Sequence, residues 1–172
     1  MSRVACQSHF AAELGYRVLK RVDLGRDAAN IFQRGQGAAP DWAPALQAAY
    51  QAAPGRHAVQ FLPLYAASVE KLLQRLETGR VAGLVGPEGA ALSEAISVAI
   101  EAELEPARAE WDAHRQERTA LVVQRRSEIF ETLERLRAAL WAGAEPPMLR
   151  ILHCPSLGLH GRAMSVGGSR VV

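Results

Sequence analysis

The chain has 172 residues, of which 49% are hydrophobic, which is enough to build the core of one domain. Its 20 basic and 18 acidic residues leave a formal net charge of +2, and because bases and acids alternate in every segment we expect no nucleic-acid partner. No apolar run has the length of a membrane span or of a signal-peptide core, so we expect a cytoplasmic location and no membrane contact. The basic residues are nearly all Arg, a bias typical of GC-rich bacterial genomes.

Residues 1–87 are predicted to form a mixed α/β portion. The first 15 residues stay ambiguous, with a short helix from Ser8 to Leu14 as one interpretation. Alternating apolar residues predict strands at Tyr16 to Leu24, His57 to Leu62 and Arg80 to Val85. Capping residues and apolar spacing predict helices at Asp27 to Arg34, Asp41 to Ala53 and Ser68 to Glu77.

Residues 88–142 are predicted to form one long helix that is kinked near Pro106. Residues that favour helices dominate this stretch, and Gly143 ends it. Two apolar stripes are expected to be buried, one before the proline and one near the far end: Leu92, Ile96, Ala99 and Ile100, then Ile129, Leu133, Leu136 and Leu140. Between them, Asp112 to Thr119 has no large apolar residue, so this section is predicted to be solvated or to face a partner.

Residues 143–172 are predicted to form a strand and a β-hairpin. Met148 to His153 has the clearest strand pattern, and Gly167-Gly168 is typical of a two-residue hairpin turn. The return strand has only Ser169 to Val172, so we expect that the chain is truncated. The predicted fold is a helix-rich α/β or α+β domain, in which a small sheet of short strands packs against helices.

A metal site is considered but not predicted. Cys6 and His9 have a C-x-x-H spacing, and Cys154 and His160 could complete a zinc site if the two ends of the chain met. Structural zinc sites usually show two tight ligand pairs, and only one is present here, so we expect neither a metal nor a cofactor. Cys154 is also a weak candidate for a nucleophile, because neighbouring strand residues point to opposite faces and His153 would face away from it.

The sequence favours an interaction function over catalysis, since it contains none of the common catalytic motifs. Apolar residues flank the charged section of the long helix, and the residues expected at an interface are Trp111, Arg115, Arg118, Leu121 and Val122. We therefore expect a protein-interaction module whose long helix contacts a protein partner or a second copy in a homodimer. The alternative is the non-catalytic N-terminal part of a larger bacterial hydrolase, such as a zinc-dependent peptidase, with its active site beyond Val172.

Overall fold

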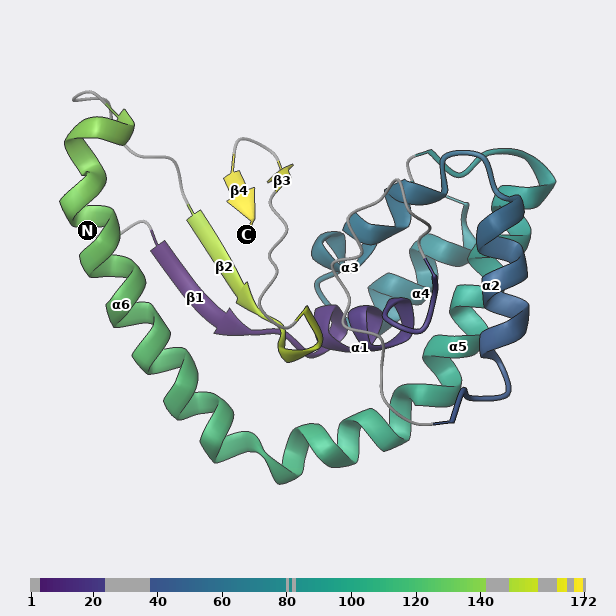
Figure 1. Cartoon of the computed structure of the whole chain (residues 1–172), viewed down its shortest axis with the longest axis horizontal. Helices are drawn as coiled ribbons and strands as arrows, with labels where there is room; N and C mark the ends of the chain where they lie inside the picture. The colour runs from purple at the N-terminus through teal and green to yellow at the C-terminus, as the bar shows by residue number, and fades with distance from the viewer. Residues whose placement is uncertain are drawn as a thin grey trace.

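Two long helices that meet at an elbow organise the chain (Figure 1). The computed structural model describes residues 4–23, 38–79, 81, 83–141, 149–157, 164–166 and 169–171. Helix α5 (Gly86–Ala113) lies among shorter helices, and helix α6 (Arg115–Trp141) runs beside a small sheet. The predicted fold class, a helix-rich α/β arrangement with one dominant helical stretch, is confirmed.

The hydrophobic core lies where shorter helices pack around α5. These elements are α1 (Phe10–Leu19), α2 (Ala43–Ala52), the 3-10 helix η1 (Arg56–Phe61), α3 (Leu62–Tyr65) and α4 (Val69–Glu77). Helix α5 contacts α1, α2 and α4 and buries the predicted stripe of Leu92, Ile96, Ala99 and Ile100. Helix α4 begins after Ser68, whose hydroxyl accepts the N–H of Lys71, as expected for an N-cap. The helices predicted at Asp41 to Ala53 and Ser68 to Glu77 are therefore confirmed.

The strand predicted at Tyr16 to Leu24 is wrong, because its first four residues belong to helix α1, Lys20 caps that helix, and the described residues that follow form a turn. Leu14 and Val18 are buried four residues apart, and Leu19 is buried next to Val18, which fits a helix and not an alternating strand. The helix continues through Gly15, where an added Cβ would lie 2.7 Å from Cγ of Pro63. Glycine therefore permits the close approach of α1 and α3.

Two further strand predictions are also wrong. His57 to Leu62 belongs to the 3-10 helix η1 and to the start of α3. Gly55 precedes η1 with a φ of 70°, and its carbonyl oxygen accepts the N–H of Ala58. The described residues between Arg80 and Val85 form a turn at Gly83. No strand among the described residues pairs with the backbone of either stretch, so local hydrogen bonds prevail. The helix predicted at Asp27 to Arg34 lies outside the described residues.

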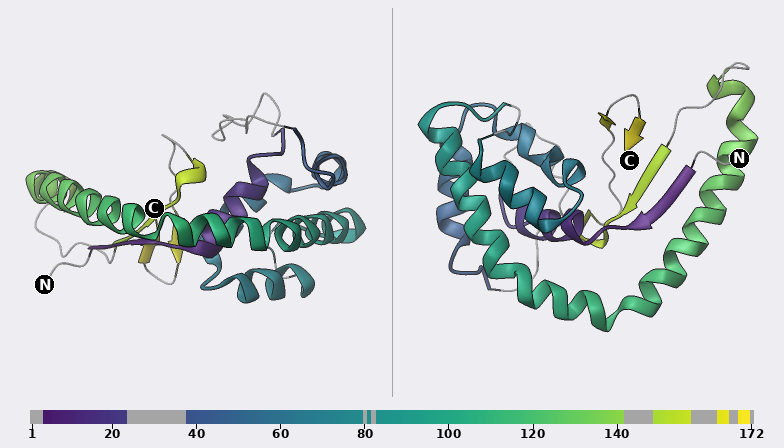
Figure 2. Two further views of the ribbon diagram at one scale, coloured as in Figure 1. Left: turned by 90° about the horizontal axis from the view of Figure 1, so that it is seen from below. Right: turned by 180° about the vertical axis from the view of Figure 1, so that it is seen from behind.

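A four-stranded sheet has the order β1-β2-β4-β3 and joins the two ends of the chain. Strand β1 (Val4–Ser8) pairs in parallel with β2 (Leu149–His153), and β2 pairs in parallel with β4 (Ser169–Val171). Strand β3 (Met164–Val166) is antiparallel to β4, so the predicted strand at Met148 to His153 and the predicted hairpin are confirmed. Strand β1 was not predicted. Helix α6 lies along the free edge of β1 (Figures 1 and 2).

The long helix is interrupted at His114 and not at Pro106. Pro106 is exposed inside α5, where water can bond the backbone carbonyl that a proline leaves unpaired. His114 ends α5 with φ −100° and ψ 21°. Helix α6 begins at the next residue, and its first hydrogen bond runs from the N–H of Arg118 to the carbonyl oxygen of His114. Of the second predicted stripe, Ile129 is half-buried, and the side chains of Leu133, Leu136 and Leu140 lie outside the described ones.

Candidate functional site

The elbow between α5 and α6 is held by side chains on both sides of His114. Carbonyls in the last turn of a helix lack partners within that helix. Here the Arg118 guanidinium donates from Nη1 to the carbonyl oxygen of Trp111 over 2.6 Å. Its Cζ also lies 3.5 Å from the centre of the Trp111 ring, close enough for a cation–π contact. Arg118 therefore joins the first turn of α6 to the last turn of α5.

Trp111 also joins the elbow to helix α1. Its ring meets that of Phe10 edge to face, with 5.4 Å between the ring centres. Arg108, one turn earlier on α5, lies over the other ring of the pair, with Cζ 4.7 Å from the centre of Phe10. Trp111 is half-buried as a result, so part of the apolar surface that the sequence assigns to a partner is covered by the same chain.

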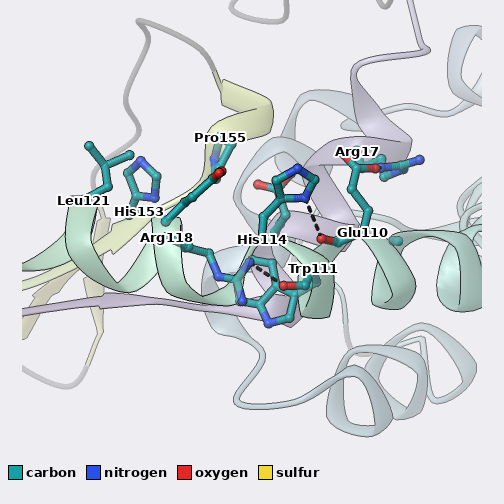
Figure 3. Close-up of a pocket in the computed structure, with 11 residues that line it drawn as sticks. Arg17, Glu110, Trp111, His114, Arg118, Leu121, His153 and Pro155 are labelled. Atoms are coloured by element: carbon teal, nitrogen blue, oxygen red, sulfur yellow. Dashed lines mark hydrogen bonds and ion pairs between the residues drawn. The ribbon is translucent and has the colours of Figure 1, made fainter.

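A pocket of about 260 Å³ opens on the inner side of the elbow (Figure 3). Helices α1, α5 and α6 form its walls together with the end of β2 and the 3-10 helix η2 (Pro155–Leu157). Its lining is Glu13, Arg17, Ala107, Glu110, Trp111, His114, Glu117, Arg118, Leu121, His153 and Pro155. The pocket thus combines one aromatic and several aliphatic groups with charged ones.

Two ion pairs fix α1 against α5 at the rim of the pocket. Arg17 Nε lies 2.8 Å from Glu103 Oε2, and Arg17 Nη1 bonds Glu110. Burial opposes the charge on Arg17, but the two carboxylates outweigh it and raise the pKa of that guanidinium. The hydrogen bond from Arg17 lowers the pKa of Glu110. Both partners are thereby held in their charged forms.

Glu13 ties helix α1 to the end of strand β2. One of its carboxylate oxygens accepts the backbone N–H of Ser156 at 3.1 Å, and the other accepts the Ser156 hydroxyl at 2.6 Å. Close to these hydrogen bonds, the Nδ1 atom of His153 is buried and has no hydrogen-bond partner among the described residues. Burial lowers the pKa of His153, so the ring is held neutral.

Of the metal candidates, Cys6, His9 and Cys154 lie in the described part of the chain, where no three His, Cys, Asp or Glu residues are placed to hold a metal ion. Cys6 is in register with Ile151, so Cys154 lies three residues farther along the sheet, roughly 10 Å away at the rise of a strand. His9 caps helix α1 through Nδ1, which accepts the N–H of Ala12. His160 lies outside the described residues.

Burial also makes both cysteines poor nucleophiles. It raises the pKa of the Cys154 thiol to about 12 and raises that of Cys6 as well. The thiolate, which is the reactive form, is therefore scarce at neutral pH at either position.

The predicted interface residues occupy two environments. Trp111, Arg118 and Leu121 line the elbow pocket, whereas Arg115 is exposed and pairs with Asp112 at 2.9 Å. Val122 is half-buried. The sequence missed the lining residues from other parts of the chain, namely Glu13, Arg17, His153 and Pro155, because no local pattern indicates that they meet α5 and α6.

The opposite face of α6 carries apolar side chains that the sequence analysis did not single out. Val123 is 60% exposed and Phe130 is 41% exposed. They are seven residues apart, so they lie on one face of the helix, on the side opposite Leu121. Among the described elements, α6 packs mainly against β1, and no described element packs on this outer face.

No known protein family, curated protein or solved structure matches the chain. None of the described helices combines the length with the hydrophobicity that crossing a membrane requires.

Proposed function

We propose that the chain is a protein-interaction module that works through helix α6 and that it pairs with a second copy of itself. The observation that carries this proposal is the outer face of α6, where Val123 and Phe130 are solvent-exposed and no described element covers them. Large apolar side chains that share one helix face and lie seven residues apart are typical of helix–helix contacts. Figure 1 supports the proposal, since α6 runs along the outside of the molecule with β1 on its inner side.

An antiparallel arrangement suits this face. With a two-fold axis between positions 126 and 127, Val123 of one protomer meets Phe130 of the partner subunit, and the same contact recurs on the other side of the axis. Exposed small residues, Ala120 and Ser127, share the face and allow two helices to approach closely. Antiparallel helices also place opposite ends of their macrodipoles together.

The expected association is weak. Partial burial of a Val and a Phe in each protomer contributes roughly 1 to 1.5 kcal/mol per side chain, or about 4 to 6 kcal/mol for the four, and the entropy lost on association opposes this gain. We therefore expect a dissociation constant no tighter than about 100 μM. Trp111 and Leu121, which the sequence predicts at an interface, are not needed for this pairing, since both side chains line the elbow pocket of their own chain.

Sedimentation equilibrium tests the proposal with Phe130→Glu, which places a charge against Val123 of the partner subunit. The matched control is Ala109→Glu, which adds the same charge at an exposed position of α5. We expect reversible dimers for the unmodified chain and the control, and monomers for Phe130→Glu. A chain that stays monomeric at about 500 μM, or dimers that Phe130→Glu leaves unchanged, would rule the proposal out.

A second candidate function, the non-catalytic part of a larger hydrolase, is supported by the sheet. Parallel strands are usually covered by helices on both faces. Here α6 lies along one edge of β1, and no described helix lies across the broad faces of the strands (Figure 2). The sheet therefore suits a larger α/β protein that supplies the missing layers. Sequencing the reading frame beyond Val172 tests this candidate: a metal-binding motif downstream supports it, and an immediate stop codon contradicts it.

A further inference from the structure

The elbow pocket has apolar walls around a small number of polar groups. Ala107, Trp111, Leu121 and Pro155 supply carbon surface from three different elements. Pockets that bind small organic groups have this composition, with apolar walls for affinity and a few polar atoms for orientation. The polar atoms that are not already paired therefore indicate which ligand the pocket would accept.

Most of the charged groups in the pocket are already paired. The lining contains three carboxylates, on Glu13, Glu110 and Glu117, and two guanidiniums, on Arg17 and Arg118. Both oxygens of Glu13 accept hydrogen bonds from Ser156. Glu110 bonds Arg17, and Arg118 lies on the Trp111 ring. Glu117 is the exception, since it has no hydrogen bond or ion pair with any residue that the structure describes.

His114 supplies a second acceptor next to Glu117. Its Nδ1 lies 2.9 Å from the carbonyl oxygen of Glu110, so Nδ1 carries the proton and donates it. With the proton on Nδ1, Nε2 is the ring nitrogen that can accept a hydrogen bond. His114 is exposed and is labelled at the pocket in Figure 3, so this atom is within reach of a ligand. His114 directly precedes α6, Glu117 lies in the first turn of that helix, and both residues line the pocket.

We infer that the elbow pocket binds a cationic group on an apolar stem, either a guanidinium or a primary ammonium. The cation donates hydrogen bonds to the Glu117 carboxylate and to His114 Nε2, and the stem lies against Trp111, Leu121 and Pro155. With three carboxylates and two guanidiniums, the lining has a formal charge of −1, which favours a cation over an anion. This site does not depend on the pairing of α6, whose outer face points away from the pocket.

The test is an NMR titration of the full chain with agmatine, which carries a guanidinium and an ammonium on an aliphatic stem. The indole N–H signal of Trp111, assigned with a Trp111→Phe variant, reports on the pocket. We expect saturable shifts with a dissociation constant on the order of millimolar. Glutarate, which has a similar length and two negative charges, is expected to cause none.

Glu117→Gln is expected to weaken agmatine binding about tenfold or more, since it replaces a charge-assisted hydrogen bond with a neutral one. Glu131→Gln is the matched control, because it removes the same charge from an exposed position of α6 that does not line the pocket. The spectra of both variants without ligand verify that the fold is retained. The inference is overturned if agmatine gives no saturable shift at tens of millimolar, if glutarate binds equally well, or if both variants weaken binding to the same extent.

A capped peptide, acetyl-Gly-Arg-Gly-amide, distinguishes the two sources of such a cation. Tighter binding of the peptide than of agmatine supports a basic side chain of a polypeptide as the ligand, and weaker binding supports a free amine or guanidine. Failure of both probes contradicts the pocket inference but leaves the pairing of α6 intact, because sedimentation measures that pairing separately.

Discussion

Replacing Arg118 with Ala should destabilise the chain more than its position in a charged section suggests. The substitution removes a cation–π contact over Trp111 and a hydrogen bond to the Trp111 carbonyl, with Cζ 3.5 Å from the ring centre and Nη1 2.6 Å from the oxygen. A cation–π contact contributes about 0.5 to 1 kcal/mol near the surface, and a hydrogen bond from a charged donor about 1.5 kcal/mol or slightly more. Because Arg118 is partly exposed, we expect a loss of about 1.5 to 2.5 kcal/mol in the free energy of unfolding.

Urea denaturation followed by circular dichroism measures this loss. Arg115→Ala is the matched control, because Arg115 is three residues away and makes only a surface ion pair with Asp112, worth less than about 1 kcal/mol. Arg118→Lys keeps the charge but loses the planar group, and it should fall between the two. If Arg118→Ala and Arg115→Ala cost the same, or if a double-mutant cycle with Trp111→Ala gives no coupling, the elbow is not held by this contact.

Three further changes test other contacts. Glu110→Gln should lower the free energy of unfolding more at pH 7 than at pH 3, because the pKa of Glu110 is lower in the folded chain and its contribution decreases as the pH falls below the unfolded value and through the folded one; equal losses at both pH values would contradict the pairing with Arg17. His153→Phe should raise the free energy of unfolding by about 1 kcal/mol, since it removes a buried unpaired nitrogen, and a clear loss in thermal denaturation would mean that His153 has a partner. Gly15→Ala should lower the free energy of unfolding by about 1 to 3 kcal/mol, because the added Cβ would collide with Pro63. An unchanged melting temperature would refute that contact.

Elements with local signals were predictable from the sequence, and elements that depend on distant partners were not. Helix α4 follows from its Ser68 cap and its apolar spacing, and strand β2 follows from its alternating pattern. Strand β1 has only five residues, and its partner β2 is near the other end of the chain, so no local pattern indicates it. In α1, the alternation of Tyr16 and Val18 resembles a strand, but burial of the neighbouring Leu19 requires a helix.

The site was predictable only on α5 and α6. Trp111 and Leu121 were singled out because they flank a charged section, and both line the pocket. Arg118 was expected to be solvated, but the break at His114 brings it over Trp111. A break one residue long has no sequence signal here, since neither Gly nor Pro occurs at it. The remaining lining residues, such as His153, come from elements that only tertiary packing brings together.

Disulfide crosslinking through Ser127 tests the central claim, the pairing of α6 with a second copy, most directly. Ser127 lies next to the proposed two-fold axis, and packed helices about 8 to 10 Å apart bring such positions within disulfide distance. In a Cys6→Ser background, Ser127→Cys is expected to form a covalent dimer on oxidation. Thr132→Cys, also exposed but on the other side of the same helix, should stay monomeric. Absence of a covalent dimer at Ser127, or an equal yield at Thr132, would contradict the account.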